Sequence, residues 1–245
     1  MIRLRRNARI AGLVACIGSS VALPSARAEV HFSILMASDY KQYGLTQTDS
    51  NPAARFSTDY AHPSGLFAGG FVSNAEYAWD ESLESQRDIL TSLYVGHQWR
   101  GQKWTSAVSI SRYIYPDYRP NYNYTQTAVS ASYKSRYFLS AARIADYPFM
   151  NQDSDQIRGG VTLPWLWGLE ASINAGELRS EGVFDFSYTF WDTGLSKVFG
   201  RFALDLRYHD DNYDRVGVAG ASGNDRWVLS IGYALNPRGR VTGSD

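Results

Sequence analysis

Apolar and polar side chains alternate along much of this chain, and this alternation limits the possible folds more than any other feature. In the clearest run Phe202, Leu204, Leu206 and Tyr208 alternate with Ala203, Asp205, Arg207 and His209. Successive side chains of a β-strand point to opposite faces, so one face of each such strand meets an apolar medium and the other a polar one. By the same rule, the run that starts at Phe184 predicts Phe186 on the apolar face and Asp185 on the polar face.

The lengths of the links between these runs distinguish a barrel from a sandwich. We expect about twelve strands, at 30–40, 52–61, 66–78, 88–99, 104–115, 123–134, 137–148, 155–165, 169–178, 184–198, 201–209 and 226–235. Longer polar links alternate with tight turns, as in bacterial outer-membrane barrels, whose short turns are periplasmic and whose long loops are external. The sequence therefore predicts an all-β fold, an antiparallel up-and-down transmembrane β-barrel of residues 29–236. Its first strand should pair with its last, because lipid tolerates no open edge.

The N-terminus has the features of an export signal. Four arginines precede an apolar run at 10–23, and Ala26-Arg27-Ala28 fits the small-x-small pattern of a signal-peptidase site. We expect residues 1–28 to be a signal peptide and 237–245 to be a polar C-terminal tail. The alternative is a lipid anchor at Cys16, because Leu13-Val14-Ala15-Cys16 resembles a lipobox.

Charge limits the partners of the exported chain. Without the five arginines of residues 1–28, 19 basic residues stand against 24 acidic ones, a net charge of −5. A nucleic-acid binder would need a basic surface, so that class is disfavoured. The expected partners are outer-membrane lipid and small polar solutes or ions, and no motif indicates a cofactor or a metal.

The alternation also predicts which charged side chains face the lumen. The candidate pore-lining residues are Arg158, Glu170, Asp185, Asp205 and Arg207. Arg112 and Arg143 share the parity of apolar neighbours, which indicates a β-bulge or a shifted register in those strands. The pattern also slips after Phe190, with Gly194 as a plausible bulge site.

Several short motifs resemble one family. They are Ser38-Asp39-Tyr40, Gly44-Leu45-Thr46-Gln47-Thr48, Pro52-Ala53, Asp59-Tyr60, Ser64-Gly65 and Ser73-Asn74-Ala75-Glu76, with Tyr113-Ile114-Tyr115-Pro116 further on. Together they resemble the Gcw_chp proteins of proteobacteria, also described as TorF-type porins. Lys41-Gln42-Tyr43 departs from the arginine- and aromatic-rich stretch usual there. The resemblance implies an outer-membrane barrel and a pore. It does not indicate which substrate would pass.

Three functions compete. The leading hypothesis is a passive channel for small polar solutes or ions. The second is a closed structural or adhesive barrel with partner-binding external loops. The third is a hydrolase at His209, Asp210 and Asp211, the one cluster with acid/base or cation-binding chemistry. A polar loop root that keeps the rim hydrated is the favoured explanation of this cluster, since no residue completes a triad. We therefore assign no catalytic residue.

Overall fold

A computed structural model describes residues 28–77, 86–118, 122–147, 152–182, 185–213 and 225–236. The expected signal peptide before Ala28, the expected tail after Asn236 and Phe184 lie outside these residues. The strands are β1 (Glu29–Ala37), β2 (Lys41–Gln42), β3 (Leu45–Thr46), β4 (Ala53–Ala61), β5 (Leu66–Tyr77), β6 (Gln86–Arg100), β7 (Trp104–Ile114), β8 (Tyr124–Tyr133), β9 (Tyr137–Tyr147), β10 (Gln152–Pro164), β11 (Glu170–Ser180), β12 (Phe186–Phe199), β13 (Phe202–Asp211) and β14 (Arg226–Ala234). One short 3₁₀ turn, η1 (Leu166–Gly168), precedes β11. Among the described residues, no helix has the length and apolar character needed to cross a membrane.

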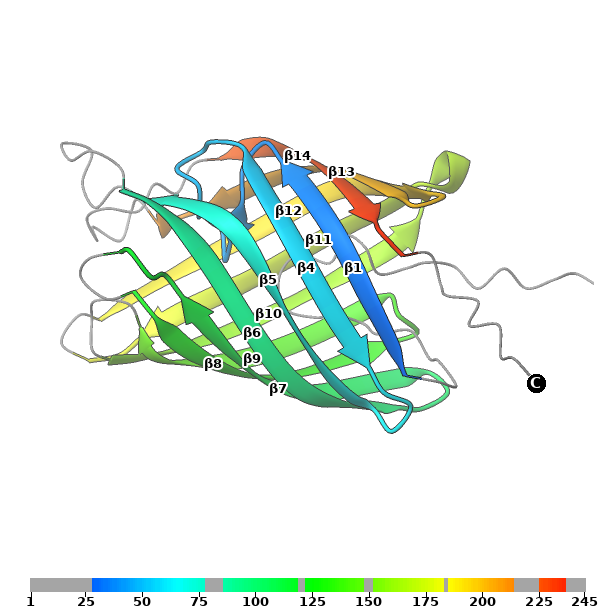
Figure 1. The fold of residues 1–245 in the computed structure, drawn as a ribbon, viewed down its shortest axis with the longest axis horizontal. Helices are drawn as coiled ribbons and strands as arrows, with labels where there is room; N and C mark the ends of the chain where they lie inside the picture. Colours follow the sequence, from blue (N-terminus) through cyan, green and yellow to red (C-terminus); the bar gives the residue numbers. More distant parts are fainter. Residues whose placement is uncertain are drawn as a thin grey trace, which may run out of the picture.

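Twelve of these strands form a closed antiparallel barrel, as the alternation predicts (Figure 1). Each strand pairs with its neighbours in the chain, and β1 closes the ring against β14. The tight links 62–65, 101–103, 134–136, 165–169 and 200–201 lie at one end, which we call the short-turn end. The opposite, long-loop end carries the longest links, 38–52 and 212–225.

The seam between β1 and β14 runs from Ser33 opposite Ala234 to Ala37 opposite Ser230. β1 extends further toward the short-turn end than β14 does. Asn236 bonds to the part of β1 that β14 does not reach. Its side chain accepts a hydrogen bond from the Phe32 amide at 2.8 Å and donates one to the Val30 carbonyl at 2.5 Å. A side-chain amide thus replaces strand pairing where β14 has ended.

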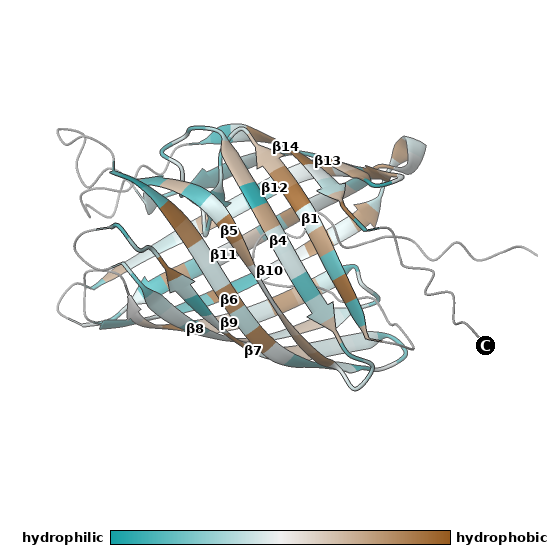
Figure 2. Cartoon of the chain, viewed as in Figure 1, coloured by the Kyte–Doolittle hydropathy of each residue, from teal (hydrophilic) through white to brown (hydrophobic). Residues whose placement is uncertain are grey.

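The outer surface is apolar along the middle of the strands (Figure 2). Exposed outward-facing side chains include Ile34, Leu93, Val95, Ile110, Val129, Leu139, Ile173, Leu195, Leu206 and Ile231. Aromatic side chains are exposed near the short-turn end, among them Trp99, Trp104, Tyr137, Trp165 and Trp167. An apolar belt bordered by aromatic rings is the surface that a barrel presents to a bilayer.

Arg112 and Arg143 both face outward. The expected irregularity is absent from β7, so that expectation was wrong there, but the pairing of β9 with β10 does shift register, between Gln152 and Ser154. The pairing of β7 with both neighbours is continuous past Arg112. Arg143 lies opposite Asp155 near the long-loop end and bonds to Asp153 at 2.8 Å and Asp155 at 3.3 Å. The strands continue beyond the apolar belt, and outward charges there meet polar surroundings.

The two faces of the first half of β12 were also assigned wrongly. Phe186, Tyr188 and Phe190 are buried inside the barrel, whereas Asp185 is exposed. Pairing of β12 with β11 and β13 is regular through Gly194, so no bulge is needed there. The whole strand keeps one parity, and its apolar outward residues are Trp191, Leu195 and Phe199.

Val129 and Ser130 provide a test of the two faces, since they are neighbours near the middle of β8. Val129 is exposed outward, and Ser130 is half-buried inside, paired with Ala107 and Ser140. We predict that Val129→Arg destabilises the barrel in lipid vesicles by about 2–4 kcal/mol, the cost of a cation facing hydrocarbon. Ser130→Arg should fold close to wild type. Reversible folding in vesicles measured by tryptophan fluorescence tests this, and equal losses in both variants would contradict the facing.

Candidate functional site

The link from β1 to β4 folds into the barrel instead of extending outward. Residues 38–52, which we call the inward hairpin, contain the strand pair β2 and β3 (Figure 1). Asp39, Tyr40, Lys41, Gln42, Gln47 and Thr48 are all buried there. The sequence predicted a longer polar link at the end opposite the tight turns. The link lies at that end, but it folds into the barrel and does not extend away from it.

Asp39 organises the base of the inward hairpin. Its Oδ1 accepts hydrogen bonds from the hydroxyls of Thr46 at 2.6 Å and Thr48 at 3.0 Å. The backbone amide of Gln47 donates a hydrogen bond to the Tyr40 carbonyl at 2.6 Å, and this bond closes the base of the hairpin. Local side-chain bonds of this kind hold a loop in shape without neighbouring strands.

A tight turn forms the tip of the inward hairpin. Tyr43 and Gly44 both have positive φ, at 53° and 87°. A Cβ on Gly44 would lie 2.8 Å from Cβ of Phe190 and 3.1 Å from Cβ of Asp211, closer than side chains pack. Glycine is required here both for the backbone conformation and for the close approach to the wall.

The tip spans the lumen between distant strands. The side-chain amide of Gln42 donates a hydrogen bond to the Tyr124 hydroxyl on β8 at 3.0 Å. The Tyr43 hydroxyl donates to the side-chain oxygen of Gln126, also on β8. The Tyr43 ring lies 6.2 Å from the ring of Phe190 on β12. Since β8 and β12 are four strands apart in the barrel, the inward hairpin forms a bar across the interior.

The root of the inward hairpin is tied to strands on both sides of it. The Glu76 amide on β5 donates to the Gln47 carbonyl at 2.9 Å, and the Glu76 carboxylate accepts from Asn51 at 3.2 Å. On β14, Arg226 lies 3.6 Å from Asp39, whose side chain is almost fully buried. The root is therefore fixed in position on the wall.

Aromatic side chains pack the rest of the interior at the long-loop end. Phe71, Tyr113, Tyr115, Tyr118, Tyr124, Phe186, Tyr188, Phe190 and Tyr213 form one buried cluster with Tyr40. A cavity of about 30 Å³ remains beside Gln42, Tyr43 and Tyr122, which is the room of about one water molecule. In the loop before β8, burial raises the pKa of Tyr118 to about 12 and also raises the pKa of Tyr122, so both phenols are neutral at pH 7.

The short-turn half of the interior is lined differently. Inward residues on β7 to β14 are mostly small there and are only half-buried, among them Thr105, Ser109, Ser130, Ser132, Ser140, Thr162, Ser172, Ser196 and Ser230. Small side chains leave solvent-sized space in front of them. The interior is thus polar and roomy at one end and packed at the other.

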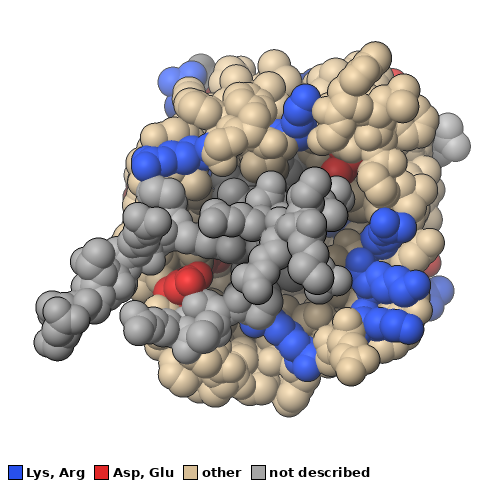
Figure 3. All heavy atoms as spheres, turned by 90° about the vertical axis from the view of Figure 1, so that its right-hand side faces the viewer, with Lys and Arg blue, Asp and Glu red and all other residues tan. Residues whose placement is uncertain are grey.

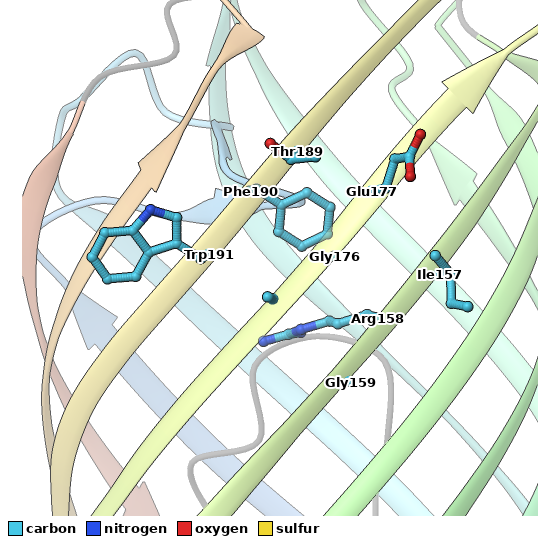
Figure 4. Close-up of a pocket in the computed structure, with 9 residues that line it drawn as sticks. Ile157, Arg158, Gly159, Gly176, Glu177, Thr189, Phe190 and Trp191 are labelled. Carbon is cyan, nitrogen blue, oxygen red and sulfur yellow. The ribbon is translucent and has the colours of Figure 1, made fainter.

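A charged cluster lies on the wall of β10 to β13. Arg207 binds Asp205 through two bonds of 3.2 and 3.0 Å and also donates to Asp192. Arg158, on β10, lies 3.1 Å from Asp192, measured from its Nη2 to Oδ2 of the carboxylate. Figure 4 shows the Arg158 side chain extending from β10 toward β12. The Asn174 amide donates to Asp192 at 2.6 Å. Each carboxylate is matched by a guanidinium, so the four charges sum to zero.

The sequence identified part of this cluster. Arg158, Asp205 and Arg207 face the interior and come together, whereas Glu170 faces inward but lies apart at the short-turn end, opposite Ser196. The prediction that Asp185 lines the pore was wrong. Asp185 is exposed just before β12 and accepts a hydrogen bond from the backbone amide of Gly182. Asp192 was missed, and it is the residue that joins the two arginines. The parity of Trp191 and Leu195, which are exposed outward, would have placed it inside.

The three residues of the expected rim site do not converge. His209 and Asp211 face the interior, whereas Asp210 faces outward and accepts a hydrogen bond from the Trp191 indole at 3.2 Å. Adjacent residues of a strand point in opposite directions, so the three cannot surround one ligand. Over the described part of the chain, no group of three or more His, Cys, Asp or Glu side chains could hold a metal ion.

A hollow of about 550 Å³ lies on the outside of the barrel, over β10, β11 and β12 (Figure 4). Its lining includes outward residues such as Ile157, Ala175 and Trp191. Gly159 and Ala175, which face each other across the strand pair, are too small to fill it. Arg158, Gly176 and Phe190, which face the interior, also contribute to its lining.

Comparison with known proteins identifies the family. Residues 22–234 match the family described as "Bacterial protein of unknown function (Gcw_chp)". The chain belongs to the Gcw_chp family. Among curated protein sequences none matches it.

The barrel is similar in fold to solved outer-membrane porins. The KdgM porin in complex with disordered oligogalacturonate has 7% identity and a TM-score of 0.52, with 85% of this chain and 100% of that chain covered. A second structure of the KdgM porin gives 7% identity, a TM-score of 0.51 and the same coverage. The COG4313 outer membrane channel from Pseudomonas putida F1 gives 10% identity and a TM-score of 0.49, over 87% of this chain and 96% of that one. At these identities the likeness concerns the fold alone.

The motifs that resemble the Gcw_chp family map onto the inward hairpin. Asp39, Thr46, Gln47 and Thr48 build its base, and Gly44 forms its tip. Asn74 and Glu76, from the later motif, bond to its last residues. The side-chain amide of Asn74 donates to the Pro52 carbonyl at 3.0 Å, and the Glu76 carboxylate accepts a bond from Asn51 at 3.2 Å. In this member of the Gcw_chp family, the motifs specify how the inward hairpin is held.

Asp192 should be the most sensitive member of the charged cluster, because its loss leaves the buried Arg158 without a carboxylate and Arg207 with Asp205 alone. Its side chain is 5% exposed, as is that of Arg207. We predict that Asp192→Asn lowers the free energy of unfolding by about 3–5 kcal/mol. The matched control is Asp155→Asn, whose side chain is 66% exposed on the outer surface and should cost less than about 1 kcal/mol. Urea titration in detergent micelles measures both, and a loss no larger than the control's would show that Asp192 does not hold the cluster together.

Proposed function

We propose that this chain is an outer-membrane channel for small polar solutes or ions, with the inward hairpin as its constriction. The observation that carries the proposal is the bar of residues 38–52 across the lumen, bonded to β8 and β5 and in ring contact with β12. The apolar belt places the barrel in a membrane. Short turns are periplasmic in bacterial barrels, so the short-turn end faces the periplasm and the hairpin lies toward the outside. Export would follow cleavage near Ala28.

The route runs from the roomy half of the lumen to the tip of the inward hairpin. Small hydroxyl side chains line the first part, and the charged cluster lies along one wall. At the tip the solute meets the Lys41, Gln42 and Tyr43 segment. The cavity of about 30 Å³ beside Gln42 and Tyr43 is too small for a hydrated ion, so a solute that passes at this point requires the tip to move. Such a constriction selects by size and by charge.

A closed structural or adhesive barrel is the second candidate, and one observation favours it. The aromatic cluster fills the long-loop half as a hydrophobic core does, with Tyr115, Tyr188 and Leu178 almost fully buried. In that case the inward hairpin is a permanent plug and the external loops bind a partner. The hydrolase has no comparable support, because the three residues of its expected site diverge.

Tyr43 provides the test between channel and plug. Tyr43→Ala removes a ring that contacts Phe190 and a hydroxyl that bonds Gln126, so the gap at the tip widens. We predict a larger single-channel conductance in planar bilayers than for the wild type. Tyr43→Phe is the matched control, since it keeps the ring and loses only the hydroxyl, and its conductance should stay near wild type.

The outcome for the second candidate is distinct. If wild type and Tyr43→Ala both fold and both remain silent in bilayers, the barrel is closed and the channel proposal fails. A conducting wild type whose conductance is unchanged in Tyr43→Ala would place the constriction away from the inward hairpin.

A further inference from the structure

Three basic residues project from two adjacent turns at the short-turn end. Lys103 belongs to the β6–β7 turn, and Lys134 and Arg136 belong to the β8–β9 turn; all three are exposed. The two turns touch, since the backbone amide of Lys134 donates to the Lys103 carbonyl at 2.6 Å. We call these three residues the basic rim patch. Figure 3 shows Lys and Arg side chains around this end of the barrel.

The charge of the basic rim patch is not balanced by acids of the same turns. Between Gln98 and Tyr137 the sequence has one acidic residue, Asp117. Asp117 lies at the opposite end of the barrel, where its amide donates to Asp88. Arginines of the long-loop end differ, because Arg87, Arg143 and Arg179 each pair with an acid. Positive charge has therefore accumulated at one end of these strands.

Aromatic rings set the depth of the basic rim patch in a membrane. Trp99, Trp104 and Tyr137 are exposed outward directly beside it, and the Trp104 ring lies 4.7 Å from that of Tyr133. The Lys134 ammonium lies 5.2 Å above the Tyr133 ring. Outward Trp and Tyr rings lie at the level of lipid headgroups. The three cations therefore lie at the level of the lipid phosphates.

We propose that the basic rim patch binds the headgroups of anionic phospholipids. Phosphate oxygens accept hydrogen bonds from Arg and Lys, and the aromatic rings provide an apolar surface for the upper part of the acyl chains. The site recognises charge at the membrane surface and involves no residue of the lumen. It depends on membrane insertion of the barrel and is independent of whether the lumen conducts.

Lipid retention by native mass spectrometry tests the proposal. The barrel is refolded in nanodiscs with equal amounts of phosphatidylcholine and phosphatidylglycerol, then released, and the lipids that remain bound are counted. We expect the wild type to retain phosphatidylglycerol preferentially. Lys103→Gln with Lys134→Gln should weaken this preference by about fivefold for each base removed.

The matched control is Lys197→Gln with Arg201→Gln, two basic positions of the same end on β12 and the β12–β13 turn. It should leave the preference near wild type. An equal loss in both double variants would show a diffuse effect of rim charge and overturn the site, as would a wild type without preference. Salt provides a measurement without mutation: raising it to about 1 M, where the Debye length is about 3 Å, should abolish the wild-type preference, and its persistence would contradict a charge-based site.

Discussion

Closure of the sheet between β1 and β14 is the constraint on which the rest of the structure depends. In hydrocarbon an unpaired amide or carbonyl has no water to bond, so a spanning sheet is stable only when its first and last strands meet. The seam provides this by pairing Ser33 through Ala37 with β14, and the Asn236 side chain extends it where β14 ends. A closed wall then fixes the alternation of every strand, because each residue faces either lipid or the interior.

The interior is where this barrel differs from a simple water-filled tube. Twelve strands enclose more space than their own side chains fill, and the inward hairpin with the aromatic cluster occupies the long-loop half of it. Polar side chains serve two purposes there. Asp39 bonds the hairpin to itself and faces Arg226, whereas Asp192 holds two arginines against the wall. Packing at one end and small side chains at the other give the lumen two chemically distinct halves.

The sequence predicted the strands of the barrel wall well, and it predicted poorly which side chains and which link fill the interior. Both outcomes have physical reasons. Strand number, order and the β1–β14 seam follow from a period of two and from turn residues, which are local signals. No local signal in the sequence predicts whether the 38–52 link folds outward or inward, since a polar loop is equally compatible with external water and with a polar lumen. Phe186, Tyr188 and Phe190 were assigned to lipid because alternation identifies an apolar face without saying what covers it. That error also displaced Asp192, whereas Arg158, Asp205 and Arg207 were found because their outward neighbours are clearly apolar.

The position of the inward hairpin in the chain has a consequence for assembly. It connects β1 to β4, so it adjoins the last edge to close, and its tip rests on β8 and β12, which are distant in the sequence. Those strands must be in place before the tip has anything to rest on. Docking of the hairpin therefore follows the placement of β8 and β12, and the interior of the long-loop half is completed only after the wall that surrounds it.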